Sequence, residues 1–140
     1  RGRYFQRYLG DRLIAVGPGA RRRLEDHLAT GGVVVALLDV APASLGLRDR
    51  AQVSFLGREI ELAVGLMRLA GAMQIPVVPY DGRVVEDRRV LTFHPPHRGV
   101  DPESLLRSTI ATLEGVVRER PWDWQGWLDL EQFFSAARTQ

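Results

Sequence analysis

Residues 33–40, with the sequence VVVALLDV, decide the predicted fold. The apolar residues of this stretch follow one another without polar alternation, which is typical of a strand buried on both faces of a parallel sheet. Glycines at positions 31 and 32 precede it and predict the end of a helix over residues 20–30. A short strand over residues 12–16 comes before that helix. The N-terminal part of the chain therefore predicts strand, helix and strand in succession.

The middle of the chain repeats this alternation. Residues 52–55 predict a short strand, residues 61–73 a helix, and residues 76–80 a further strand. Four apolar residues share one face of the helix, and they are Leu62, Leu66, Leu69 and Met73. Because only Glu61 and Arg68 are charged there, we expect the helix to be mostly buried.

The C-terminal part predicts a hairpin and two helices. Strands over residues 83–85 and 89–93 flank the turn Glu86-Asp87-Arg88. Asp101 is placed to cap a helix that begins at Pro102 and runs to about residue 119. A final amphipathic helix is expected over residues 122–138. Together the elements predict an α/β fold with a mostly parallel central sheet and helices on both faces.

Composition limits the classes of protein to consider. The chain has 140 residues, of which 45% are apolar and none is Cys, so a single domain is expected without disulfides or a thiolate metal site. The longest apolar run, residues 33–38, is far shorter than the ~20 residues of a membrane span. A net charge of +2 argues against a dedicated nucleic-acid binder. The chain begins with Arg rather than Met, so we expect a part of a longer protein.

Asp39 is the most informative candidate for a site. It ends the expected buried strand, where open α/β sheets bind their ligands. The alternative is that Asp39 bonds backbone amides of the loop over residues 41–50 and has a structural role. The sequence leaves both alternatives open.

Two histidines could contribute to a metal site. His94 and His97 flank two prolines, and Asp101 and Glu103 follow. The prolines stiffen the segment into an extended form in which both imidazoles can share a side. Nothing in the sequence fixes a third ligand, so a surface loop in which Asp101 caps the next helix is favoured and no metal is expected.

Two other patterns have both a functional and a structural interpretation. Arginines at positions 21–23 could attract an anionic surface, but Glu25 and Asp26 follow, and a solvated helix face is favoured. The aromatic residues after Pro121 could enter a bilayer interface, but core packing is favoured. They are Trp122, Trp124, Trp127, Phe133 and Phe134.

The order of five segments resembles a known family. They are LATGGVVVALLD at 28–39, VSFLG at 53–57, GLMRLA at 65–70, IPVVP at 75–79 and PWDWQGW at 121–127. In this order and spacing they resemble the bacterial late acyltransferases of lipid A biosynthesis and the acyltransferases of phosphatidylinositol mannosides. Both belong to the lysophospholipid acyltransferase superfamily.

The resemblance implies a membrane-associated acyltransferase at the cytoplasmic face of the bacterial inner membrane. Such an enzyme moves a fatty acyl group from acyl carrier protein or acyl coenzyme A to a hydroxyl of a lipid or glycolipid acceptor. The thioester is a co-substrate, and neither a cofactor nor a nucleic-acid partner is implied. The implied fold is glycerol-3-phosphate-acyltransferase-like and N-terminally truncated.

The resemblance also implies site residues. Asp39 matches the acid beside the family's substrate channel, and Phe55 with Gly57 matches its Phe-x-Gly turn, so all three are expected to bind substrate. The family's catalytic His has an acid five positions later, but here Gly32, Gly99 and Pro102 follow the three histidines at that distance. No catalytic residue is therefore expected in this chain. Val40 stands where the lipid A enzymes usually have Gln, which leaves other glycolipids open as acceptors.

Two rival functions remain from the sequence. One is a non-catalytic module of the same fold that binds lipid or protein, and the other is an unrelated small α/β enzyme that uses Asp39 with His94 or His97. If the chain is truncated, we also expect it to self-associate and to expose Leu62, Val64 or Leu66.

Overall fold

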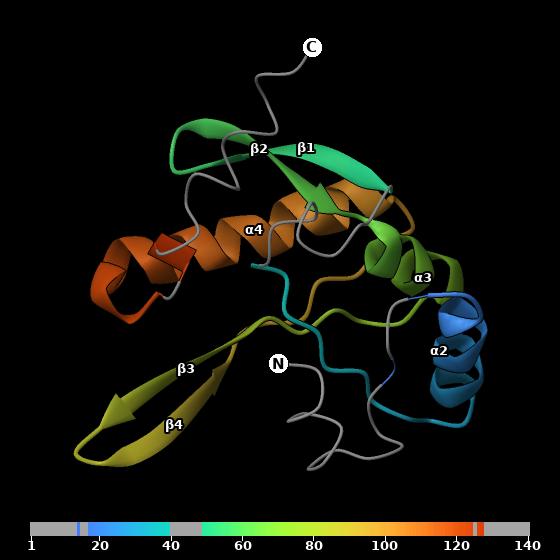
Figure 1. Ribbon diagram of the computed structural model, residues 1–140, viewed down its shortest axis with the longest axis horizontal. Helices are drawn as coiled ribbons and strands as arrows, with labels where there is room; N and C mark the ends of the chain where they lie inside the picture. The colour runs from blue at the N-terminus through green and yellow to red at the C-terminus, as the bar shows by residue number, and fades with distance from the viewer. Residues whose placement is uncertain (1–13, 15–16, 40–48, 125, 128–140) are drawn as a thin grey trace. The chain divides into compact units, whose positions relative to one another are not determined.

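The computed structural model describes residues 14, 17–39, 49–124 and 126–127. The chain divides into two compact units, Arg1–Leu37 and Leu38–Gln140. All of the expected strand over residues 12–16 except residue 14, and most of the expected helix over residues 122–138, lie outside the described residues. Figure 1 shows the course of the chain and the labels of its helices and strands.

In the first unit, helix α2 (Ala20–Ala29) confirms the predicted helix and its glycine stop. Gly31 has a φ of 82°, and the N–H groups of Gly31 and Gly32 donate to the carbonyls of Leu28 and His27, both at 3.0 Å. This pair of bonds is the Schellman motif, which satisfies the last carbonyls of a helix and needs a left-handed residue after it.

The strand predicted over residues 33–40 is wrong. Residues 33–37 belong to no helix or strand, and Val33, Val35 and Leu37 are 80%, 71% and 70% exposed. A strand exists only where a neighbour accepts its backbone hydrogen bonds, and none of the described strands pairs with these residues.

The second unit begins its regular structure with an antiparallel hairpin of β1 (Arg50–Phe55) and β2 (Arg58–Ala63). The turn residues Leu56 and Gly57 have φ values of 52° and 76°, the positive angles that a two-residue type I′ turn requires. Alternate residues of this hairpin are buried, and they are Val53, Phe55, Ile60 and Leu62. The hairpin therefore has one face in the core.

Helix α3 (Gly65–Met73) follows at once. The helix predicted from residue 61 thus began four residues too early, because Glu61, Leu62 and Ala63 complete β2. Partial exposure was expected for Leu62, Val64 or Leu66, and of these Leu66 is 39% exposed, whereas Leu62 and Val64 are buried, at 1% and 0% exposed.

A second antiparallel hairpin confirms the one predicted around Glu86-Asp87-Arg88. It consists of β3 (Tyr80–Val85) and β4 (Arg88–Phe93), and Glu86 and Asp87 in its turn have φ values of 47° and 63°. The strand expected over residues 76–80 is reduced to one bridge between Val77 and His97.

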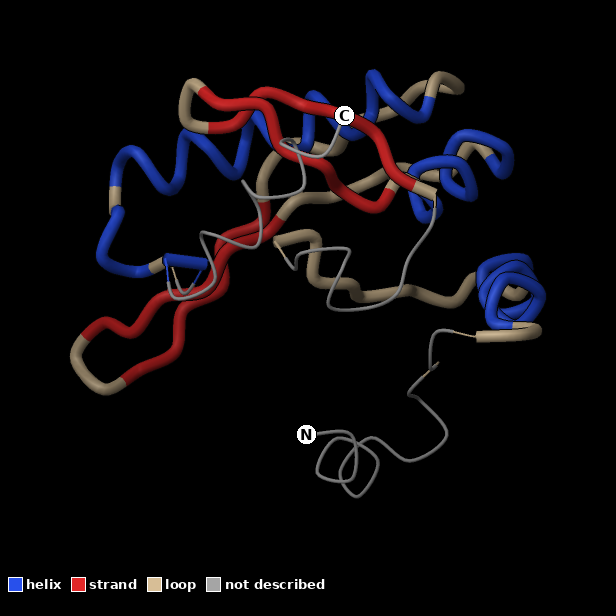
Figure 2. Tube along the Cα trace, turned by 45° about the horizontal axis from the view of Figure 1, so that its top comes forward, coloured by secondary structure: helices blue, strands red, loops and turns tan. Residues whose placement is uncertain are grey.

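Helix α4 (Pro102–Glu119) confirms the predicted helix, and Asp101 Oδ2 caps it by accepting the Ser104 N–H at 2.8 Å. A short 3₁₀ helix, η3 (Pro121–Asp123), follows. In Figures 1 and 2, the β1–β2 hairpin lies along α4, whereas the β3–β4 hairpin extends away from it. The core of this unit is built from the inner face of β1–β2, from α3 and from one side of α4, with Leu105, Leu106, Ile110 and Val117 on the α4 side.

The predicted fold class is therefore wrong. The described residues form two separate two-stranded antiparallel sheets and three α-helices, with no parallel central sheet. Both hairpins close through two-residue turns, so each strand pairs with its neighbour in sequence instead of crossing over to a distant one. No helix among the described residues is long and apolar enough to cross a membrane.

Candidate functional site

Two of the three residues predicted to bind substrate meet at Trp124. The indole Nε1–H of Trp124 donates to Asp39 Oδ2 at 3.1 Å, although the two residues are 85 positions apart. The ring of Phe55 packs against the same indole in an edge-on arrangement, with centroids 5.3 Å apart and planes at 69°. Asp39, Phe55 and Trp124 thus form one contact group, which we call the Trp124 cluster.

The sequence after α4 positions Trp124. Pro121 opens η3, and the turn bends the chain so that Trp124 is extended, with a φ of −84°, and only 8% exposed. Trp127 supports it from the side, with ring centroids 4.9 Å apart, and donates its own indole N–H to the Pro121 carbonyl. Trp122 is 76% exposed. Core packing therefore holds for Trp124, and Phe133 and Phe134 lie outside the described residues.

The sequence predicted that Asp39 ends a strand, but in the structure it belongs to no strand. It is half-buried and accepts a hydrogen bond from Trp124, 85 positions away. Its Oδ1 has no hydrogen-bond partner in the part of the chain that the structure describes. Residues 40–48, whose backbone amides the structural alternative for Asp39 involves, lie outside that part.

Gly57 lies apart in the turn of the β1–β2 hairpin. It is exposed, its φ is 76°, and no atom lies within 4 Å of the place that a Cβ would occupy. A positive φ explains why a glycine suits this position, whatever else the turn contacts. The structure thus accounts for Gly57 as a turn residue and leaves its predicted role in substrate binding a prediction.

A second polar group was not anticipated from the sequence. Asp81 Oδ2 lies 2.7 Å from His94 Nε2, and Asp81 Oδ1 accepts from Arg120 Nη2 at 2.7 Å. The side chains of Asp81 and Arg120 are each 13% exposed and that of His94 is 23% exposed. Because an ionised carboxylate only accepts hydrogen bonds, His94 carries a proton on Nε2 toward Asp81.

The electrostatics of this group favour the ionised form of Asp81. Burial raises the pKa of Asp81, but hydrogen bonds from His94 and Arg120, with the charge of Arg120, outweigh it, so the pKa lies below its ordinary value. The hydrogen bond to Asp81 raises the pKa of Arg120. Arg120 Nε is buried without a hydrogen-bond partner in the described structure. The group therefore ties the base of the β3–β4 hairpin to the end of α4.

The strand register could have revealed this group. Asp81 pairs with Thr92, and the His94 N–H bonds the Pro79 carbonyl, so Asp81 and His94 project from the same face of the hairpin. The hairpin was predicted from residue 83, two positions too late for Asp81 to appear as a strand residue. Nothing in the sequence pointed to Arg120 as the third member.

The two histidines that were considered as metal ligands contact different partners. His94 is held by Asp81, whereas His97 Nε2 lies 3.1 Å from Thr112 Oγ1 on α4. The other two acids, Asp101 and Glu103, pair with Arg107 at the start of α4. Within the described ranges no group of three His, Cys, Asp or Glu side chains could hold a metal ion.

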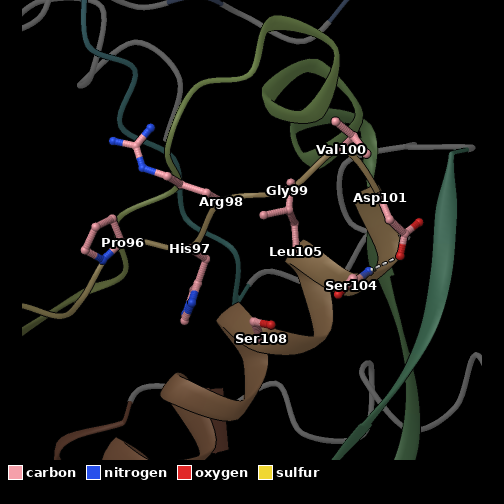
Figure 3. Close-up of a pocket in the computed structure, with 9 residues that line it drawn as sticks. All are labelled: Pro96, His97, Arg98, Gly99, Val100, Asp101, Ser104, Leu105 and Ser108. Atoms are coloured by element: carbon pink, nitrogen blue, oxygen red, sulfur yellow. Dashed lines mark hydrogen bonds between the residues drawn. The ribbon is translucent and has the colours of Figure 1, made fainter.

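A groove of about 340 Å³ lies beside the first turns of α4. Figure 3 shows that its polar side chains do not converge: Arg98 extends away from α4, Asp101 turns to the opposite side, and His97 points down along α4, where its partner is Thr112. The groove therefore presents no set of side chains aimed at a common ligand.

The arginines at positions 21–23 lie on the exposed side of α2. Arg21 Nε lies 2.8 Å from Glu25, and Arg22 Nε lies 3.9 Å from Asp26. Two of the three cations thus face acids one turn away on their own helix. This arrangement agrees with the solvated helix face that the sequence favoured.

Comparison of the chain with protein-family models, with curated proteins and with solved structures finds no match.

Proposed function

We propose that this chain is part of an acyltransferase that moves a fatty acyl group from acyl carrier protein or acyl coenzyme A to a hydroxyl of a lipid or glycolipid. The enzyme would act at the cytoplasmic face of the bacterial inner membrane. Its catalytic His would come from outside these 140 residues, since no His of the chain has an acid five positions later. A His of this kind removes the proton of the acceptor hydroxyl while the acid orients the imidazole.

The observation that carries the proposal is the Trp124 cluster. Three of the five segments that resemble the acyltransferases, those with Asp39, Phe55 and Trp124, are far apart in sequence and meet around one indole. Motifs of one functional unit are expected to be neighbours in space, whereas an accidental resemblance of separate segments carries no such expectation. The support comes from this convergence and from the order of the motifs.

In this proposal the Trp124 cluster positions residues and does not perform chemistry. Asp39 is held by Trp124, and Phe55 is 2% exposed, so neither is free to move toward a substrate. The cluster would fix Asp39 so that its remaining oxygen, Oδ1, faces the acceptor or donor. The base that activates the hydroxyl, which contributes ~10²- to 10⁴-fold in such reactions, belongs to the rest of the enzyme.

The test is an acyl-transfer assay of the product of the complete reading frame. Radiolabelled palmitoyl coenzyme A and palmitoyl-acyl carrier protein are offered with lysophospholipid and with phosphatidylinositol mannoside, and labelled lipid is extracted. We expect transfer by the complete product and none by residues 1–140 alone. The Asp39→Asn variant of the complete product keeps an oxygen that accepts from Trp124 but loses the negative charge. It therefore tests whether that charge is needed for transfer.

Two results would contradict the proposal. A folded complete product that transfers no acyl group from either donor would exclude the activity. Transfer by residues 1–140 alone that is abolished by His94→Gln would move the catalytic base into this chain and refute its placement elsewhere.

A further inference from the structure

The β3–β4 hairpin has one apolar face that no other described element covers. The register places Tyr80, Gly82 and Val84 of β3 opposite Phe93, Leu91 and Arg89 of β4 on this face. Val84, Leu91 and Phe93 are 70%, 58% and 68% exposed, and Tyr80 is 39% exposed. We call this surface the hairpin face.

The opposite side of the hairpin is already anchored. It carries Asp81, which holds His94 and Arg120, so its base is attached to the end of α4. Figures 1 and 2 show the hairpin extending from this attachment, away from α4. A two-stranded hairpin is marginally stable in water unless its apolar face packs against something. Packing against an occupant would therefore stabilise the hairpin through this face.

We propose that the occupant is a second copy of this chain, whose hairpin face packs on the first in a two-fold arrangement with the strands antiparallel. The face has its aromatic pair, Tyr80 and Phe93 with ring centroids 5.9 Å apart, at one end. At the other end it has one cation, Arg89, which has no ion-pair partner within the described residues. Antiparallel packing places Arg89 of each copy over the aromatic pair of the other, a cation–π contact.

The same packing separates the two Arg89 charges and brings the two Leu91 side chains together. Arg89 and Phe93 are four residues apart, or roughly 14 Å along a strand, so the two Arg89 side chains are separated by more than the ~8–10 Å Debye length. Parallel packing would gather both cations at one end and leave them without rings. At the centre of the face, Leu91 lies across Gly82, since a Cβ on Gly82 would be 3.3 Å from Leu91 Cδ2. In the antiparallel dimer the Leu91 side chains of the two copies meet at this point.

The area available predicts a weak dimer. The exposed apolar side chains of the hairpin face amount to about 500 Å² on each copy, within the range of the largest patch on an ordinary monomer. Two copies would bury about 1,000 Å² in total, which is the lower limit for a specific interface. We therefore expect a weak dimer whose population rises with protein concentration.

Sedimentation equilibrium from about 1 µM to about 1 mM protein tests the dimer. We expect the average mass to rise toward twice the monomer value, and Arg89→Glu to weaken association at least tenfold. Arg88→Glu makes the same charge change on the neighbouring residue, which projects from the opposite side of the hairpin, and should leave association unchanged. Circular dichroism verifies that both variants fold.

Cross-linking tests the geometry, because the chain has no Cys of its own. With a bis-maleimide that spans the ~10 Å between stacked sheets, Leu91→Cys should form covalent dimers. Val84→Cys should form none, because antiparallel packing holds this residue far from the same residue of the second copy. Arg88→Cys should also form none, because it projects from the opposite side of the hairpin.

Three results would overturn the proposal. A protein that stays monomeric up to about 1 mM has no such interface. Efficient cross-linking of Val84→Cys would show another arrangement. A monomer that floats with anionic phospholipid vesicles, and loses this binding in Phe93→Ser but not in Arg88→Glu, would assign the face to a lipid surface instead.

Discussion

Asp39→Ala is the most informative single substitution, because it removes the acceptor for a buried indole. Trp124 is 8% exposed, and its Nε1–H donates to Asp39 at 3.1 Å. Leaving a buried donor unpaired costs about 1–3 kcal/mol. Asp39 is only half-buried, so water can partly replace the carboxylate, and we expect the lower half of that range, about 1–2 kcal/mol.

The assay is urea unfolding followed by far-UV circular dichroism, which does not depend on the indole being present. Asp39→Asn keeps an amide oxygen in place of the acceptor and should cost less than about 1 kcal/mol. A cycle with Trp124→Phe should give a coupling energy of about 1 kcal/mol, since Phe has no donor to leave unpaired. If Asp39→Ala changes the free energy of unfolding by less than about 0.3 kcal/mol, or if Asn costs as much as Ala, the bond does not hold the cluster together.

Four further substitutions test other parts of the second unit. Asp81 has a lowered pKa, so it stabilises the fold above its unfolded pKa of about 3.9, and the gain is lost as pH falls toward the lower folded pKa. The difference in unfolding free energy between the wild type and Asp81→Asn should therefore narrow below about pH 4. A difference that stays constant as the pH is lowered would refute the stabilising role of the Asp81 charge. Asp101→Ala removes the cap of α4 and should cost about 1 kcal/mol in thermal unfolding; no loss would show that the bond is dispensable. Gly71→Ala places a Cβ 2.7 Å from the Val100 carbonyl oxygen and should cost about 1–3 kcal/mol, whereas Gly115→Ala on open α4 surface should stabilise by about 0.5–1 kcal/mol; equal effects would contradict the close approach.

Signals that act within a few residues predicted the local elements correctly. Asp101 followed by Pro102 begins α4 as expected, and the glycines after α2 form the stop that the sequence indicated. The hairpin over β3 and β4 also formed around the predicted turn, although Glu86 and Asp87 have left-handed backbones without being glycine. Each of these signals lies within a few consecutive residues, so it predicts the local element without reference to a distant part of the chain.

The pairing of strands could not be predicted in the same way. Ile60 and Leu62 are buried at a spacing of two residues, but Leu62 also fits the helical spacing of Leu66 and Leu69, so the sequence allowed either element over residues 61–63. The type I′ turn at Leu56-Gly57 decides in favour of the strand, because it places residues 58–63 beside β1. A turn without Asn or Asp beside its glycine is a weak signal in the sequence.

The site was predicted in part. Asp39 and Phe55 were singled out, and they meet, but through Trp124 rather than at the edge of a sheet. The aromatic residues after Pro121 were expected to pack in the core without a specific acceptor. A bond across 85 positions leaves no trace in local spacing, so only the folded chain reveals it. The Asp81–His94 pair was missed because the hairpin was predicted to begin at residue 83, whereas Arg120, 39 positions from Asp81, leaves no trace in local spacing.

The exposure of residues 33–37 follows from the size of the sheets that do form. A strand apolar on both sides is buried only when it has strands beside it and a layer over each face. The β1–β2 hairpin has one buried face, which its own Val53, Phe55 and Ile60 already fill. The β3–β4 hairpin has only two strands, and no described element covers its apolar face. Neither sheet therefore offers the enclosed position that the sequence VVVALLDV predicts, and Val33, Val35 and Leu37 remain exposed in the described part of the chain.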